Sequence, residues 1–113
     1  MKYAILLFDN PENWASVSES DLASMHREYM AVADAPEAYG GAQLQPQETA
    51  KTVRLQNGEL LVTDGPFAET KEVVSGFYLV DADTEERALE LAKQIPTVSR
   101  MGGVIEVRPI VER

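Results

Sequence analysis

The chain has 113 residues, a common size for one domain, and its 44% hydrophobic and 26% charged residues are ordinary globular values that exclude extensive disorder. Its formal charge of −9, with no block of Lys or Arg, argues against direct binding to nucleic acid or to anionic membranes, since both require clustered basic side chains. The absence of cysteine excludes disulfides and thiolate chemistry, and a single histidine argues against a protein-only zinc site, so we expect no metal and no other cofactor.

The first third of the chain predicts a strand followed by a helix. Tyr3–Phe8 is a continuous apolar run, typical of a central strand covered on both faces. Ser18 provides a hydroxyl that could cap a helix, and from Leu22 the apolar residues recur at helical spacing. Pro36 should end this helix near Ala35, because proline disfavours a helical conformation in the residue before it.

The middle of the chain predicts a β-hairpin. Two strand-like segments, Thr52–Gln56 and Glu59–Thr63, flank the dipeptide Asn57-Gly58. Such a dipeptide suits a two-residue type I′ turn, because both turn positions need positive φ. The register of that turn places two apolar pairs on one face of the hairpin, namely Val53 with Val62 and Leu55 with Leu60.

The remaining elements are three strands and a second helix. The strands are expected at Ala42–Pro46, Val73–Val80 and Val104–Arg108. The helix should begin at Asp83, because Glu86 three residues later completes a pattern similar to a capping box. Pro96 should end it.

The order of elements is β-α-β, hairpin, β-α-β, within a single domain of residues 1–113. Two helices against one face of an antiparallel sheet predict an α+β fold, a ferredoxin-like split βαβ sandwich with an added β-hairpin. The other face of the sheet, rich in Val, Leu and Phe, needs cover, so we expect a homodimer that closes sheet against sheet. No apolar run is long enough for a signal-peptide core or a membrane span, so we expect a cytoplasmic protein.

The most distinctive segment of the chain is Thr63–Glu72, which reads T-D-G-P-F-A-E-T-K-E. It resembles the signature of the DGPF branch of the YCII-related family. Further matches are Lys2-Tyr3, Leu44-Gln45-Pro46, Thr49-Ala50, Thr52-Val53-Arg54, Gly76-Phe77-Tyr78-Leu79 and Glu106-Val107-Arg108-Pro109. The resemblance covers essentially the whole chain. The family pattern has several more residues before Leu44, so we expect the end of the first helix or the second strand to be shortened.

The family resemblance implies a dimeric α+β barrel with a cleft between the sheet and the helices. Relatives in the wider YCII group are thought to use a His–Asp pair for acid–base chemistry on small cyclic or aromatic acids. The DGPF branch is often associated with sigma-factor genes, and its function is largely unknown. The resemblance therefore implies more about shape than about activity.

Asp64 and His26 are the candidate catalytic residues. Asp64 opens a turn, where its carboxylate could accept backbone N–H groups; it also leaves a strand at an expected pocket mouth, where it could bind a ligand or transfer a proton. His26 falls within the apolar stripe of the first helix and could be a general base near neutral pH. The alternative for His26 is a partly buried histidine satisfied by a neighbour. The pairing of His26 with Asp64 is a hypothesis, because the matching motif does not extend to residue 26.

Four further residues are candidates for ligand binding. Phe67 could stack on a planar ligand, with packing as the alternative. Lys71 could hold a substrate carboxylate while Glu69 orients it, or both could belong to a solvated charged segment. Arg54 could contribute to an anion-binding rim, with a surface salt bridge as the alternative.

Two functions agree with these features. The first is a homodimeric small-ligand-binding or regulatory protein, for instance one that acts with sigma-factor transcription systems, where the acidic charge would favour a basic protein over DNA. The alternative is a cofactor-independent isomerase or lyase that moves a proton on a small carbonyl compound or aromatic acid. An enzyme should place Asp64, His26 and Lys71 around one enclosed pocket, whereas a binding partner should expose an apolar or acidic patch.

Overall fold

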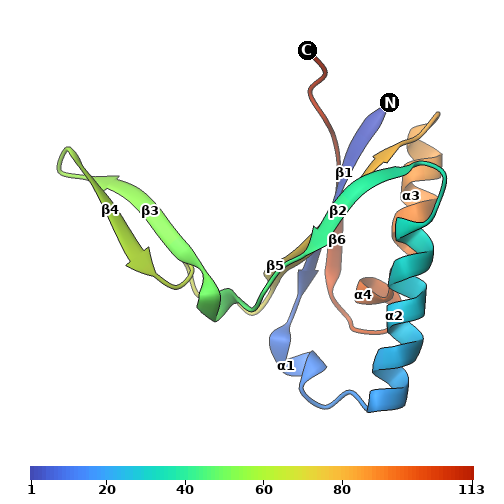
Figure 1. Cartoon of the computed structure of the whole chain (residues 1–113), viewed down its shortest axis with the longest axis horizontal. Helices are drawn as coiled ribbons and strands as arrows, with labels where there is room; N and C mark the ends of the chain where they lie inside the picture. Colours follow the sequence, from blue (N-terminus) through green and yellow to red (C-terminus); the bar gives the residue numbers. More distant parts are fainter.

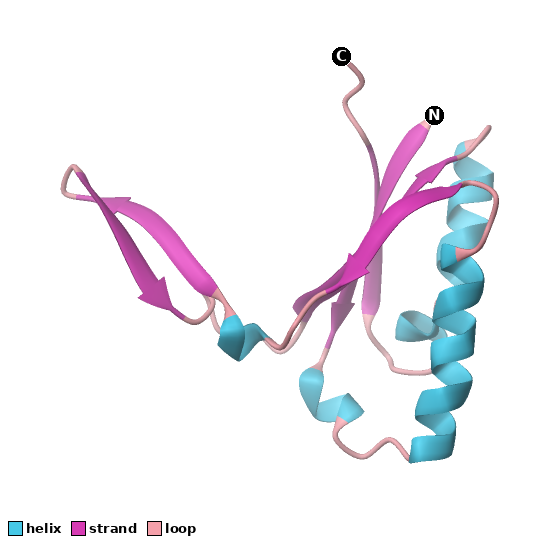
Figure 2. Cartoon of the chain, viewed as in Figure 1, coloured by secondary structure: helices cyan, strands magenta, loops and turns pink.

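The computed structural model describes residues 1–113 and contains six strands in two separate sheets (Figures 1 and 2). The elements are, in chain order, β1 (Lys2–Asp9), α1 (Pro11–Trp14), α2 (Glu19–Ala33), β2 (Ala38–Gln43), the 3₁₀ turn η1 (Gln47–Thr49), β3 (Lys51–Gln56), β4 (Glu59–Asp64), β5 (Val73–Asp81), α3 (Glu85–Lys93), α4 (Pro96–Ser99) and β6 (Val104–Pro109). The large sheet has the order β2-β5-β1-β6, and all its neighbours are antiparallel. The fold is therefore α+β, as expected, and the single chain closes no barrel.

Strand β1 is the centre of the large sheet, and its burial alternates. Tyr3, Ile5 and Leu7 are buried on the face covered by the helices, whereas Ala4 and Leu6 are only half-buried on the other face. The prediction of a strand covered on both faces is wrong for the single chain, because α2 and α3 lie on the same side of the sheet (Figure 1). The core lies between that face and the two helices, where Val32, Leu91 and Ile95 are almost completely buried.

The helix starts are set by side-chain hydroxyls. The Ser18 hydroxyl accepts a hydrogen bond from the backbone N–H of Asp21 at 3.2 Å, which confirms the predicted cap of α2. Helix α3 begins one residue later than predicted. Its cap is Thr84, whose hydroxyl accepts from the backbone N–H of Arg87 at 3.1 Å, and Asp83 lies outside the helix. The capping hydrogen bond to the residue three positions later is therefore made by Thr84 and not by Asp83.

The second strand begins earlier than predicted. Helix α2 ends at Ala33 and β2 occupies Ala38–Gln43, whereas the sequence predicted a strand at Ala42–Pro46. The connection between them is short, so the chain enters the sheet almost immediately after the helix. Pro46 instead precedes the 3₁₀ turn η1, a position that needs no ladder hydrogen bond from its nitrogen.

The predicted hairpin is confirmed in its register. Asn57 and Gly58 have φ values of 52° and 81°, as a type I′ turn requires. Val53 pairs with Val62, and Leu55 pairs with Leu60. The hairpin nevertheless forms a sheet of its own and projects away from the large sheet, on the side opposite α2 and α3 (Figures 1 and 2).

The structure has two longer helices, α2 and α3, and two single-turn helices, α1 and α4. None of them combines the length and the apolar character needed to cross a membrane.

Gly41 is required where β2 crosses β5. Its φ is 146°, and an added Cβ would lie 2.5 Å from the carbonyl oxygen of Phe77. We expect Gly41→Ala to lower the free energy of unfolding by about 2 kcal/mol or more, because the strand would have to move away from its neighbour. Chemical denaturation measures this loss.

The matched control is Gly40→Ala, one residue earlier in the same strand. Its added Cβ would meet only the Leu79 side chain, at 3.3 Å, so the loss should be much smaller. Equal losses in the two variants would contradict the assignment of the constraint to Gly41.

Candidate functional site

The site is a cleft between α2 and the edge of the large sheet. It has a volume of about 970 Å³, within the range of small-molecule sites. One wall is α1 and α2, the other is β2 with the adjoining parts of β1 and β5, and the segment Leu44–Glu48 lines one end. More than half of the lining residues are hydrophobic, and they include the aromatic residues Trp14, Tyr29 and Tyr78. The lining includes no Lys or Arg.

Asp9 is the buried polar group of this cleft. The alternation of β1 turns Asp9, its last residue, toward the helices, where only 5% of it is exposed. Its Oδ2 accepts hydrogen bonds from the hydroxyls of Ser75 and, at 3.5 Å, of Thr97. Its Oδ1 is buried and has no hydrogen-bond partner. A buried acceptor without a partner costs about 1–3 kcal/mol, so this oxygen is the first candidate to accept a hydrogen bond from a ligand.

The loop before β6 packs tightly behind the Asp9 carboxylate. A Cβ added to Gly103 would lie 3.2 Å from Asp9 Oδ1 and 2.4 Å from the carbonyl oxygen of Phe8. Only glycine leaves room there for the carboxylate. The residues around Asp9 therefore hold it in place, and its Oδ1 is enclosed beside this loop without a hydrogen-bond partner.

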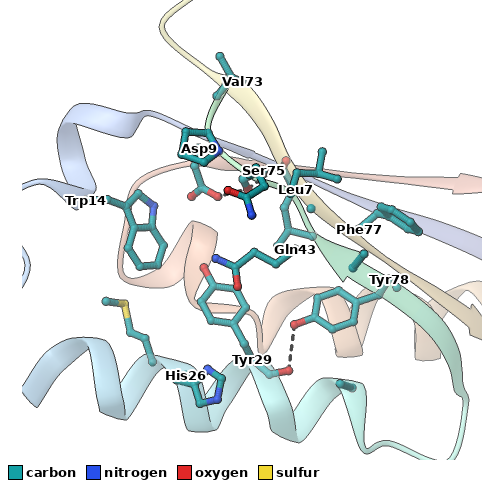
Figure 3. Close-up of a pocket in the computed structure, with 18 of the residues that line it drawn as sticks. Leu7, Asp9, Trp14, His26, Tyr29, Gln43, Val73, Ser75, Phe77 and Tyr78 are labelled. Atoms are coloured by element: carbon teal, nitrogen blue, oxygen red, sulfur yellow. Dashed lines mark hydrogen bonds between the residues drawn. The ribbon is translucent and has the colours of Figure 1, made fainter. Parts of the chain in front are cut away.

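Two tyrosines join α2 to the sheet beside Asp9. The Tyr29 hydroxyl lies 2.9 Å from that of Thr97, and the Tyr78 hydroxyl donates to the Tyr29 carbonyl oxygen at 2.9 Å (Figure 3). The Trp14 ring packs beside Tyr29, with 6.2 Å between the ring centroids. Burial raises the pKa of Tyr29 and that of Tyr78 to about 12. Both hydroxyls are therefore protonated near neutral pH and can donate hydrogen bonds.

His26 is the one predicted site residue that lines the cleft. It lies on α2, on the wall opposite Asp9 (Figure 3). Its side chain is exposed and makes no hydrogen bond within the chain, so it is not the buried, satisfied histidine considered as the alternative. His26 is therefore accessible to a ligand that enters the cleft.

The other predicted site residues lie outside the cleft. Asp64 ends β4, forms an ion pair with Lys51, and has 86% of its side chain exposed. Arg54 is exposed on β3. The structure does not bring these residues to His26, and their functional roles stay predictions. The three remaining predicted site residues lie in the exposed connection between β4 and β5; they are Phe67, Glu69 and Lys71.

The sequence reasoning missed Asp9 and the groups that hold it. The signal was present: Tyr3, Ile5 and Leu7 share a period of two, and Asp9 continues it. A carboxylate at a position that shares the face of the buried residues indicates a polar group that faces the core. The prediction of one continuous apolar run over Tyr3–Phe8 concealed that period and left Asp9 outside the strand.

The structure shows no group of three or more His, Asp or Glu side chains arranged to hold a metal ion. The cleft lining also includes no Lys or Arg of the kind that pairs with the phosphate of a nucleotide cofactor. What the arrangement can do is bind an apolar molecule and accept a hydrogen bond or a proton from it at Asp9.

Tyr29 and Tyr78 should make the stability of the protein fall at high pH. Both ionise near pH 10 in the unfolded chain and near 12 in the folded one. Their stabilising contribution is therefore complete below pH 10 and is lost as the pH rises toward 12. We expect a slope of up to about 1.4 kcal/mol per pH unit for each tyrosine, measured by denaturation at several pH values.

The Tyr78→Phe variant separates this effect from other alkaline titrations. Its free energy of unfolding should fall less steeply between pH 10 and 12 than that of the wild-type protein. Identical slopes in the two proteins would refute the assignment.

Comparisons with known proteins agree with the resemblance carried by the Thr63–Glu72 segment. The family model for the YCII-related domain matches residues 1–113. An uncharacterised protein of Rhizobium meliloti (strain 1021) is 35% identical over 117 residues, which span 97% of this chain and 92% of that protein. The assignment to the DGPF branch stays a prediction. A match that covers the whole chain shows that it belongs to the YCII-related domain family.

Proposed function

We propose that the protein is a homodimeric small-molecule-binding protein whose ligand occupies the cleft between α2 and the sheet. The observation that carries this proposal is the apolar cleft itself, whose lining includes the buried Asp9 carboxylate with its unpaired Oδ1. A ligand that brings an N–H or O–H donor to this carboxylate would reduce the cost of burying it with an unpaired oxygen. A cleft of about 970 Å³ can hold a small organic molecule.

The charge of the cleft restricts the ligand class. The acidic lining residues are Asp9 and Glu48, and His26 is the only lining side chain that could carry positive charge. An aromatic acid would place its carboxylate near Asp9 without a Lys or Arg to pair with it, which is costly away from water. We therefore infer a neutral or cationic ligand with an aromatic or apolar body and a hydrogen-bond donor.

The alternative function is a cofactor-independent isomerase or lyase acting on a small carbonyl compound. It is favoured by one observation: two titratable groups, Asp9 and His26, line the same cleft from opposite walls (Figure 3). Asp9 would accept a proton from a carbon beside the carbonyl group, and protonated Asp9 or His26 would return a proton to a neighbouring atom. In this proposal Asp9 takes the role that the sequence suggested for Asp64.

The homodimer is supported by the uncovered face of the large sheet. This face bears Leu6, Phe77, Leu79 and the exposed Val104. The strand order β2-β5-β1-β6, with helices on one face, supports the ferredoxin-like arrangement, and two such sheets placed face to face would form the dimeric α+β barrel that the family implies. The cytoplasmic location and the association with sigma-factor systems rest on the sequence and on the family resemblance alone.

Binding should depend on Asp9 and on a donor in the ligand. We expect small aromatic amines and aromatic alcohols to raise the melting temperature, and the corresponding aromatic acids to have little effect. Asp9→Leu should weaken binding of the best amine or alcohol about tenfold or more, the loss expected for one hydrogen bond to a charged group. The same substitution should also lower stability, because it leaves the Ser75 and Thr97 hydroxyls without their acceptor.

Asp64→Asn is the matched control, because Asp64 is exposed and lies outside the cleft. Isothermal titration calorimetry should give it the affinity of the wild-type protein. A preference for aromatic acids, or equal losses in Asp9→Leu and Asp64→Asn, would contradict the proposal. Turnover of a carbonyl compound that is lost in both Asp9→Asn and His26→Ala would favour the enzyme instead.

A further inference from the structure

The hairpin formed by β3 and β4, called the arm below (residues 51–64), lacks support from the rest of the chain. Its two strands pair only with each other. No helix or strand of the rest of the chain, called the body below, packs extensively against them. Figure 2 shows the arm as two strands that stand apart from the large sheet. A two-stranded hairpin alone in water is marginally stable at best. The arm therefore needs a surface to pack on.

One face of the arm is apolar and open to solvent. The register places Val53, Leu55, Leu60 and Val62 on that face, and their exposed fractions are 63%, 68%, 75% and 67%. Arg54 and the other residues of the opposite face are polar, with the exception of Leu61, which is 37% exposed. A contiguous apolar surface with a polar reverse side is typical of an interface.

The body presents a second uncovered apolar surface on the same side of the molecule. The helices cover one face of the large sheet, and the arm projects beyond the other face (Figure 1). That face bears Leu6, Phe77 and Leu79. The arm and this apolar face thus both lie on the side of the molecule that the helices leave uncovered (Figure 1).

Charge favours a second copy of the chain as that molecule. The chain carries a net charge of −9, but the arm is neutral, because Lys51 and Arg54 balance Glu59 and Asp64. The open sheet face is balanced as well. Its charged side chains are Lys2, Asp81, Glu106 and Arg108, two of each sign, and Arg108 pairs with Glu106 at 2.8 Å while the N-terminal amine pairs with Asp81 at 3.0 Å. Two copies can meet through these surfaces without like-charge repulsion, whereas a basic partner would be attracted to the acidic remainder.

We propose that the arm is exchanged between two copies: the face formed by Val53, Leu55, Leu60 and Val62 packs against the body of the partner copy beside its open sheet face. This inference rests on the proposed homodimer and adds the segment that holds it together. Each arm then gains the packing surface that its own body does not provide.

The exchange would also complete the ligand cleft. The segment that leads into the arm lines the cleft through Leu44–Glu48, and Val73 lines it where the chain returns from the arm. At the base of the arm, the residue before β3 is joined to the residue after β4: the Gly65 N–H donates to the Ala50 carbonyl oxygen at 2.7 Å. An arm held by the partner would therefore fix the position of one end of the cleft, and a free arm would leave it loose.

The test is the oligomeric state of arm variants, measured by sedimentation equilibrium. The wild-type protein should be a dimer, and Leu55→Gln/Leu60→Gln should raise the dimer dissociation constant about a hundredfold, because two leucines lose their apolar cover. The matched control is Leu61→Gln, which makes the same change on the opposite face of β4 and should shift the constant by no more than about threefold.

Hydrogen exchange of the backbone amides in β3 and β4 provides a second measurement. These amides should be protected in the wild-type dimer and exchange rapidly in the double variant, while β1 and β5 stay protected in both. Replacing residues 51–64 by a short glycine linker should weaken the dimer as the double variant does. The same excision should also lower affinity for the aromatic amine or alcohol that binds the wild-type protein best.

The outcomes separate this inference from the homodimer itself. A double variant that remains a wild-type-like dimer would overturn the exchange and leave sheet-to-sheet association intact. A wild-type monomer with rapidly exchanging arm amides would overturn both the exchange and the homodimer. Equal weakening by the double variant and by Leu61→Gln would overturn the assignment of the interface to the apolar face.

Discussion

The structure depends on the one-sided cover of its central strand. Strand β1 pairs with β5 and β6 and points alternate side chains to opposite faces, but helices cover only one of these faces. On the face that the helices cover, β1 contributes Tyr3, Ile5 and Leu7 to the core. Asp9 is the last residue of β1 on the same face. The side chains on the other face of β1, such as Ala4 and Leu6, belong to an apolar surface that no helix covers. The core, the polar group of the cleft and the expected subunit interface thus all follow from the period of two along one strand.

The cleft exists because α2 is held to the sheet by polar contacts at one side. Tyr78 donates to the backbone of α2, Tyr29 reaches Thr97, and Thr97 and Ser75 surround the Asp9 carboxylate. These contacts keep the helix in place while leaving apolar lining exposed. An unpaired carboxylate oxygen in such a place lowers stability, and proteins commonly retain a cost of this kind where a ligand or a reaction uses it.

The distinctive segment at residues 63–72 has a structural role that is visible at the base of the arm. Gly65 adopts φ of 89°, a conformation that favours glycine, and its carbonyl oxygen accepts from the Thr52 hydroxyl at 2.7 Å. The ion pair between Lys51 and Asp64 lies at the same point. The aspartate and glycine of the motif therefore close the arm where it joins the body. The residues that follow, Phe67 to Glu72, are exposed in the connection to β5.

The sequence by itself determined the local features: the hairpin register, the positive φ at Asn57 and Gly58, the Ser18 cap and the family. Each of these depends on neighbouring residues, through turn geometry, capping hydrogen bonds or a contiguous motif. Only the tertiary structure decided that the hairpin leaves the sheet and that Asp9, not Asp64, joins His26 in the cleft. The physical reason is that these positions depend on which distant strands pair and which faces the helices cover, and local sequence carries little information about either.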